Sequence, residues 1–165
     1  MNTAVSRMQF LRGKFRGGEG ALRPPWAVDV ECFLDGCTRC DLCRDHCPAG
    51  IIVAGSGGFP TVDFANGACT FCGACGDHCV PGVLSSSARK NGDRPWVYLA
   101  RFTKACLNRL GIVCRSCSDH CSAGAIRFQP VPGGALLPTV APERCTGCGA
   151  CHAPCPAGAV EIGCF

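Results

Sequence analysis

The sequence predicts a small α+β protein made of two copies of one module, with a core organised around inorganic groups instead of apolar side chains. Three observations support this fold class. Cysteine accounts for 18 of the 165 residues, far above its usual share in a globular domain. The cysteines fall into four runs, and three of these runs share one regular spacing. The second half of the chain also repeats the run, glycine turn and short strand of the first half.

The most regular run is CTGCGACHAPCP, from Cys145 to Pro156. Its C-x2-C-x2-C-x3-C-P spacing is the one by which bacterial ferredoxins hold 4Fe-4S clusters. Three thiolates on a tight loop can bind three irons of one cubane, while the fourth cysteine is carried onward and, in two-cluster ferredoxins, binds the other cluster. The spacing therefore predicts duplicated, bacterial-type, two-cluster ferredoxin-like modules with a cluster-dominated core.

The first module is predicted over residues 28–84, after a basic tail and an Arg23-Pro24-Pro25-Trp26 segment that together make up residues 1–27. We expect that segment to be stiff and extended, because proline fixes φ, with Trp26 packed on the module. Two regular runs flank a glycine turn and short strand at residues 57–64. The exchange rule predicts two ligand sets: Cys37, Cys40, Cys43 and Cys79 for one cluster, and Cys47, Cys69, Cys72 and Cys75 for the other.

A linker is predicted over residues 85–105, where a serine run is followed by charged residues, Asn91-Gly92 and Pro95. Within it, residues 96–99 are able to form a strand against the neighbouring module. The second module is then predicted over residues 106–165, and residues 125–128, 133–134 and 137–140 copy the strand, glycine turn and strand of the first half.

The third run departs from the regular spacing. A regular run would need cysteine at position 111, which is Gly111, and Cys106 is the available substitute. The alternative is that Cys106 is a buried thiol beside a three-cysteine remnant. The sequence therefore predicts three to four clusters per chain. The expected ligand sets of the second module are Cys106, Cys114, Cys117 and Cys155, and Cys121, Cys145, Cys148 and Cys151.

The remaining cysteines and the histidines are not predicted to bind iron. Cys32 and Cys164 match no motif position and are expected to be ordinary small residues. Histidine recurs beside the cysteines, but thiolates already complete the predicted sites, so we expect polar or solvent-facing roles around them. These histidines are His46, His78, His120 and His152.

Other functional classes fit the pattern less well. Structural zinc sites join two C-x2-C pairs across a dozen or more residues, whereas each regular run here places four cysteines within eleven positions. Disulfides are not expected in a reducing cytosol. No nucleophile–base pair, phosphate-binding glycine loop or paired-carboxylate motif stands out, so the chain is not predicted to be an enzyme.

The charge distribution argues against a nucleic-acid partner. The formal net charge is +4, but residues 1–23 carry five cations and one anion, so the remainder is neutral before any cluster binds. Four oxidised clusters with their thiolates would add a charge of about −8. The loaded body is therefore expected to be acidic, and a basic nucleic-acid-binding surface is not predicted.

The N-terminal residues 1–27 contain no apolar run long enough for a signal peptide or a membrane span, and a cytoplasmic location is expected. The stretch from Ser6 to Arg12 looks like the polar part of a twin-arginine export signal, with Met8 at the second arginine position. Two interpretations remain open for this tail: a flexible basic segment and a short amphipathic docking segment.

Several of these features together resemble the NapF family, the ferredoxin-type accessory proteins of periplasmic nitrate reductase systems. They are the two modules, the RPPW segment, the irregular third run and the SRxxFLR-like start, and they cover essentially the whole chain. The resemblance implies a cytoplasmic iron–sulfur protein whose partner is the catalytic subunit NapA, and which assists NapA maturation before export through electron transfer or cluster assembly chemistry. The alternative is a general multi-cluster electron carrier or electron-transfer subunit for other redox enzymes.

Removing the clusters is expected to unfold most of the chain. Ligating cysteines do not form an apolar core, and the chain has only two Trp, one Tyr and nine Phe, so metal binding must supply much of the folding free energy. Far-UV circular dichroism before and after chelation measures this. A spectrum unchanged by chelation would contradict the prediction.

Overall fold

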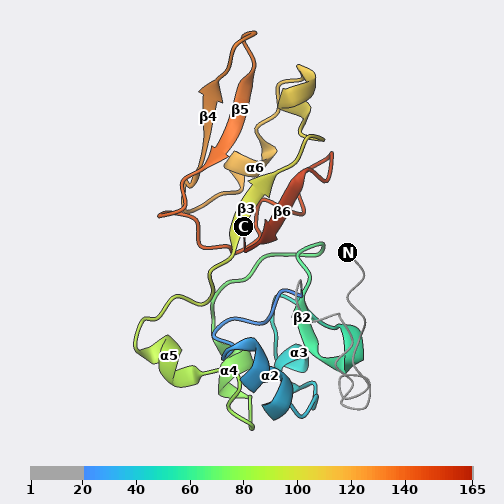
Figure 1. The fold of residues 1–165 in the computed structure, drawn as a ribbon, viewed down its shortest axis with the longest axis vertical. Helices are drawn as coiled ribbons and strands as arrows, with labels where there is room; N and C mark the ends of the chain where they lie inside the picture. The colour runs from blue at the N-terminus through green and yellow to red at the C-terminus, as the bar shows by residue number, and fades with distance from the viewer. Residues whose placement is uncertain (1–20, 165) are drawn as a thin grey trace, which may run out of the picture. The chain divides into compact units, whose positions relative to one another are not determined.

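The computed structural model describes residues 21–164, and the predictions for the basic tail lie outside these residues. The chain divides into two compact units (Figure 1). Of the described residues, 21–63 and 73–95 form the first unit, and 64–72 and 96–164 form the second. This division differs from the sequence repeat, because residues 64–72, which contain the first half of the second cysteine run, group with the second half of the chain.

The helices of the first unit are short and several lie inside cysteine runs. Helix α2, Val30–Gly36, has seven residues, and the Asp29 side chain caps it by accepting from the Cys32 amide at 3.0 Å. Helices α3, Leu42–Asp45, and α4, Ala74–Asp77, are single turns. No helix within residues 21–164 is long and apolar enough to cross a membrane.

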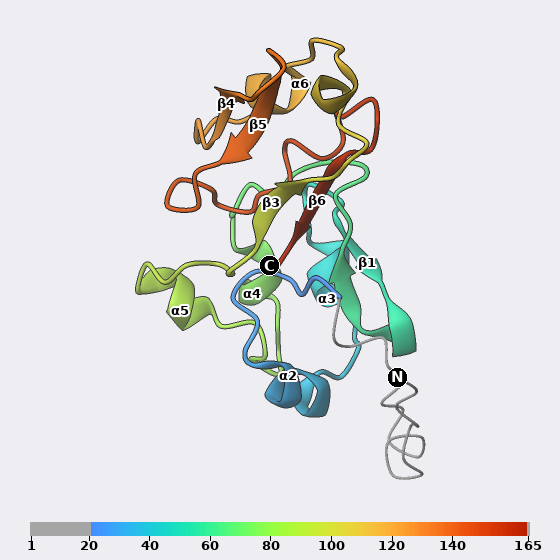
Figure 2. The ribbon, with the colours of Figure 1, turned by 45° about the horizontal axis from the view of Figure 1, so that its top comes forward.

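A hairpin connects the two cysteine runs of the first half, as the sequence predicts. Strand β1, Ile52–Ala54, pairs antiparallel with β2, Pro60–Val62 (Figure 2). Ile52 is the register partner of Val62. The turn η1, Ser56–Gly58, joins them, and Gly57 has a φ of 67°, a conformation that favours glycine. The expected glycine turn into a short strand is confirmed.

Trp26 packs in the first unit, which confirms one prediction for its segment and corrects another. The side chain is buried, and its indole Nε1 donates to the Asp93 carbonyl at 3.0 Å. The segment is not extended throughout, however. The Ala27 amide donates back to the Pro24 carbonyl at 3.3 Å, and Trp26 has a φ of 56°, so the chain turns there and the ring reaches the unit.

The segment predicted as a linker carries two regular elements. Helix α5, Ser86–Lys90, begins after Ser85, whose hydroxyl accepts from the Ala88 amide at 3.1 Å. The serine run that favours a loop in the sequence also supplies this N-cap. Strand β3, Leu99–Phe102, starts three residues later than the predicted strand at 96–99. It belongs to the second unit, where it pairs with the C-terminal strand.

The second unit repeats the order of the first half. Its elements are η2 (Leu107–Leu110), α6 (Ser116–Asp119), the antiparallel hairpin of β4 (Ile126–Pro130) and β5 (Leu136–Val140), and β6 (Val160–Gly163), which pairs antiparallel with β3. A bridge between Ala27 and Leu84 is the corresponding terminal pairing of the first unit. This arrangement is consistent with a duplicated module.

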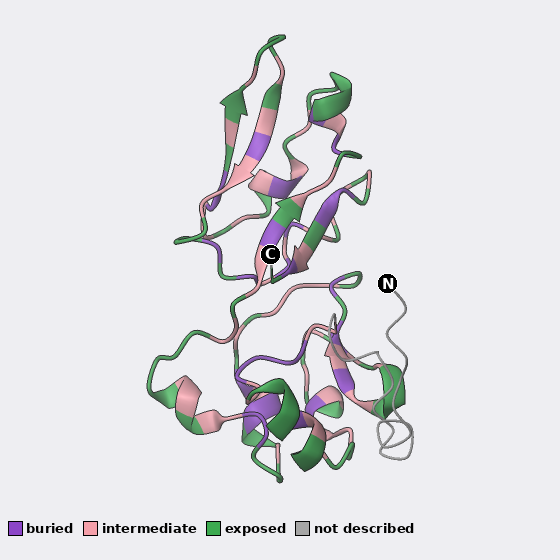
Figure 3. Ribbon diagram, in the orientation of Figure 1, coloured by how far each residue is buried: buried purple, intermediate pink, exposed green. Residues whose placement is uncertain are grey.

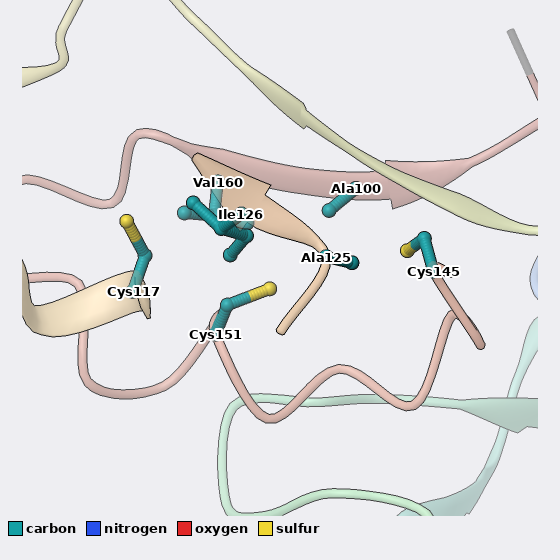
Figure 4. Close-up of a cluster of buried hydrophobic side chains, with 7 residues drawn as sticks. All are labelled: Ala100, Cys117, Ala125, Ile126, Cys145, Cys151 and Val160. Atoms are coloured by element: carbon teal, nitrogen blue, oxygen red, sulfur yellow. The ribbon is translucent and has the colours of Figure 1, made fainter. Parts of the chain in front are cut away.

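The organic core is thin, as the composition predicts. Buried positions occur as short stretches in most elements of the chain (Figure 3). In the second unit, the buried cluster consists of small and medium side chains together with three cysteine sulfurs (Figure 4). Its members are Ala100, Cys117, Ala125, Ile126, Cys145, Cys151 and Val160. Thiols therefore occupy positions that large apolar side chains take in an ordinary core.

Candidate metal centres

Three of the four cysteine runs contain the same local device. The third cysteine of each lies in a single helical turn, and these residues are Cys43 in α3, Cys75 in α4 and Cys117 in α6. A histidine follows each turn, and its Nδ1 donates to the carbonyl four residues earlier at 2.8 to 2.9 Å. The three histidines are His46, His78 and His120. Their rings close the turn directly before the fourth cysteine, a capping role that accords with the polar role expected of them.

Backbone amides point at cysteine sulfurs in equivalent places of the second unit. The Ala125 amide lies 3.3 Å from the Cys121 Sγ, and the Ala159 amide lies 3.2 Å from the Cys155 Sγ. Both bonds join the fourth cysteine of a run to the amide four residues later. In iron–sulfur proteins, hydrogen bonds to the cysteine sulfurs contribute to the reduction potential of the cluster.

One cavity lies in the first unit, and cysteines from the first and second runs line it. Its empty space is about 340 Å³, including the part open to solvent. Apolar residues such as Phe33, Pro60 and Leu84 form much of the wall. The cysteines that line it are Cys37, Cys40, Cys43 and Cys79. The structure thus brings together the first predicted ligand set, three cysteines from one run and the fourth from the other.

A second cavity, also of about 340 Å³, lies in the second unit against the buried cluster of Figure 4. Its cysteines are Cys121, Cys145, Cys148 and Cys151. Close backbone approach shapes this wall, because a Cβ on Gly149 would collide with the Phe64 ring and one on Gly147 with the Tyr98 carbonyl. The Trp96 indole also donates to the Thr146 carbonyl at 2.8 Å.

A third cavity belongs to the irregular run, and its empty space, including the part open to solvent, is about 310 Å³. Its cysteines are Cys106, Cys114, Cys117 and Cys155. Cys106 is buried, and Phe102 and Val160 complete much of the apolar wall. Cys106 therefore lines the same cavity as the cysteines it was expected to join, in spite of the seven residues that separate it from Cys114.

The fourth predicted set is divided between the units. Cys47 and Cys75 belong to the first unit, and Cys69 and Cys72 to the second. Within the second unit, the Cys69 amide donates to the Cys148 carbonyl at 2.8 Å. A backbone hydrogen bond thus joins the second run directly to the fourth.

Burial has a strong effect on the third cysteine of a run. Desolvation raises the pKa of Cys43 to about 12, of Cys117 to about 11 and of Cys151 to about 12, with nearby cysteines adding to the effect. These thiols hold their protons at neutral pH until a metal displaces them. By contrast, the Leu42 amide and the Thr38 hydroxyl lower the pKa of the exposed Cys40.

Among residues 21–164, no three His, Cys, Asp or Glu side chains gather around the position of a single metal ion. A cubane cluster does not require such a gathering, because each of its thiolates binds a different iron. Cys32 and Cys164, which match no motif position, are both exposed and line none of the three cavities described above.

Asn108 is a residue of the site that the sequence did not single out. It is 7% exposed and lines the third cavity. Its Nδ2 donates to the Cys114 carbonyl at 2.7 Å, and its Oδ1 accepts from the Cys114 amide at 3.4 Å. The side chain therefore links the start and the end of the segment between Cys106 and Cys114, which we call the inserted loop. The only local signal for it is a polar amide in the mostly apolar segment 107–113, whose one charged residue is Arg109.

Comparison with known proteins identifies the cysteine runs as parts of two iron–sulfur domains. Family models described as 4Fe-4S dicluster domain match residues 36–84 and residues 112–159. All the cysteines of the four runs lie within these ranges except Cys106. The chain therefore contains two 4Fe-4S dicluster domains, which together have places for up to four clusters.

Curated relatives resemble the chain over nearly its whole length. It is 38% identical over 160 residues to the ferredoxin-type protein NapF of Escherichia coli K12, covering 97% of this chain and 95% of the relative. It is 41% identical to the NapF protein of Haemophilus influenzae, covering 96% and 93%. The methylamine utilization ferredoxin-type protein MauM of Methylorubrum extorquens is 32% identical, with coverage of 86% and 71%.

Substituting Asn108 by alanine is expected to loosen the inserted loop. The change leaves the Cys114 carbonyl and amide without their partners, at a cost of about 1–3 kcal/mol. Amide hydrogen exchange over residues 107–114 should accelerate.

The Asn108→Asp variant should be no better than the alanine variant, because its second oxygen would face the Cys114 carbonyl. Arg109→Ala, at the exposed neighbouring position, is the control and should not change the exchange; wild-type rates in Asn108→Ala would refute the role.

Proposed function

The chain belongs to the family of the ferredoxin-type protein NapF, and from this premise we propose that it assists the maturation of NapA, the catalytic subunit of periplasmic nitrate reductase. It acts in the cytoplasm before NapA is exported, through electron transfer or iron–sulfur assembly chemistry, and is not itself an enzyme. The observation that supports this best is the grouping of four cysteines around each of three cavities, which suits a carrier of several clusters.

The proposed ligands follow the exchange rule of two-cluster ferredoxins. Three sets coincide with the cysteines that line the cavities, and the fourth rests on motif spacing alone. The sets are Cys37, Cys40, Cys43 and Cys79; Cys121, Cys145, Cys148 and Cys151; Cys106, Cys114, Cys117 and Cys155; and Cys47, Cys69, Cys72 and Cys75.

Bound 4Fe-4S clusters supply one-electron oxidation and reduction, and the chain's own groups prepare the places for them. Apolar side chains form much of the cavity walls, and burial keeps Cys43, Cys117 and Cys151 protonated until iron binds. The amides of Ala125 and Ala159 donate to the sulfurs of Cys121 and Cys155, and hydrogen bonds of this kind would tune the reduction potential of a bound cluster. Loading therefore releases protons, because thiols must become thiolates to bind iron.

The basic tail is the proposed contact for NapA. Residues 1–20 combine four cations with Phe10, Leu11 and Phe15, whereas the fifth cation, Arg23, is buried in the first unit. The tail can therefore bind through charge and a small apolar contact. The tail would act as a tether and add to whatever contacts the cluster-bearing body makes.

A second candidate function is a general electron carrier. The similarity to MauM, a ferredoxin-type protein named for methylamine utilization, favours it, because a related chain is named for a different process. Both functions require the same cysteines and differ in the choice of partner.

Replacing Cys106 by serine should remove about four irons per chain, because one of four ligand sets loses its first thiolate. Iron and acid-labile sulfide on anaerobically purified protein measure the loss, and the spectra of the other clusters should stay largely intact. Cys164→Ser, which changes an exposed cysteine outside the motifs, is the matched control and should lose no iron. Three clusters in the wild type, with no loss in Cys106→Ser, would defeat the assignment.

The protein should co-purify from cytosol with NapA that still carries its export signal, and much less with mature NapA. Deleting residues 1–20 should weaken the complex without changing the iron content, and added salt should weaken it too, because salt screens charge pairs. Association with several unrelated redox enzymes, indifferent to the tail and to the export state of NapA, would instead support the general electron carrier.

A further inference from the structure

The insertion in the third run exposes large apolar side chains. We define the docking loop as residues 109–113. Within it, Leu110 is 64% exposed, Ile112 54% and Val113 87%. A regular run has two residues between its first two cysteines, whereas seven separate Cys106 from Cys114. Apolar groups that gather at a surface commonly mark an interaction site, and here they gather at the point where the run departs from its regular form.

The docking loop has a fixed shape. At its base, the Asn108 side chain donates to the backbone carbonyl of Cys114 and accepts from the backbone amide of the same residue. The Arg109 amide donates to the Cys106 carbonyl and the Ile112 amide to the Leu107 carbonyl, each at 2.9 Å. Gly111, with a φ of 79°, permits the turn between them. A partner that binds here would lose little free energy to ordering the loop.

The docking loop also lies next to a cysteine cavity. Leu107 and Asn108, which immediately precede it, line the third cavity together with Cys106 and Cys114. A protein bound to the loop would therefore be close to whatever that cavity holds. Among the three cavities described, this is the one whose wall continues directly into an exposed apolar loop of the same run.

Cations flank the docking loop without acidic residues among them. Between Phe102 and Ser118 the sequence has Lys104, Arg109 and Arg115 and no Asp or Glu. All three side chains are exposed, and none of them forms an ion pair within residues 21–164. An apolar centre with a cationic border matches a partner that has apolar groups bordered by carboxylates. The cations also offset the negative charge that a bound cluster brings.

The cations around the docking loop favour one of three possible binding partners. The chain's own tail is basic and would be repelled, and a second copy that docked through the same loop would place cations against cations. We propose that the docking loop binds an acidic redox protein that donates one electron to the centre held by Cys106, Cys114, Cys117 and Cys155. The donor is oxidised by one electron and the centre is reduced by one, and no bond forms or breaks. This inference rests on the proposed cluster at that site and goes beyond the proposed role of the tail.

Anaerobic stopped-flow reduction of the loaded protein by a fully reduced, acidic flavodoxin tests the inference. One variant carries Leu110→Ser, Ile112→Ser and Val113→Ser, and another carries Lys104→Glu and Arg109→Glu. We expect each to slow second-order reduction by about tenfold or more, and salt to slow the wild type. The matched control, Val97→Ser, changes a residue that is 70% exposed in the same unit and should have no effect.

Dithionite separates the possible failures, because a small reductant needs no docking surface. Dithionite should reduce all variants and the wild type equally, and their iron contents should agree. Flavodoxin reduction that is slow in the wild type, that is insensitive to salt, or that is as fast in both variants as in the wild type would overturn the inference and leave the proposed clusters in place. Protein that contains no iron and shows no reduction by dithionite would overturn the proposed function, and the inference with it.

Discussion

The convergence of thiols from two separate runs is the constraint on which the rest of the structure depends. Each of the three cavities takes three cysteines from one run and a fourth from another run of the same half. The fourth cysteine must therefore leave its own run at a defined angle. The histidine-capped turns set that angle in three runs, and the hairpins between runs set the distance over which the two runs meet. The helices and strands are short, and their main effect is to position the cysteine sulfurs.

The same constraint explains why thiols replace apolar side chains in the core. A cavity closed to water protects a cluster, but burial also raises the pKa of its cysteines, to about 12 for Cys43 and Cys151. Iron binding reverses this effect by stabilising the thiolate. The cysteines therefore stabilise the fold mainly as iron ligands and much less as protonated thiols. Folding and metal binding are therefore coupled through the same side chains.

Spacing predicts much of this arrangement, and the parts that it misses have identifiable physical causes. The cysteine runs, the glycine turn at Gly57 and the duplicated hairpins follow from local patterns that have few alternatives. The serine run before α5 is different, because Ser85 favours a loop and a helix N-cap equally until the neighbouring chain is known. Asn108 is harder still: its importance lies in two hydrogen bonds to Cys114, and no local pattern indicates which peptide a buried amide will reach.

The irregular third run lacks the regular cysteine spacing and has an exposed apolar loop in its place. Loss of cysteine at position 111 removes no thiol from the cavity, because Cys106 lines it from further upstream. Seven residues separate Cys106 from Cys114, whereas a regular run has only two residues between its first two cysteines. The Asn108 side chain holds the longer segment together through its two hydrogen bonds to Cys114. Residues 109–113 can therefore face solvent. The insertion thus keeps a four-cysteine cavity and adds an apolar, cation-bordered surface beside it, which a regular run of two-residue spacings has no room to form.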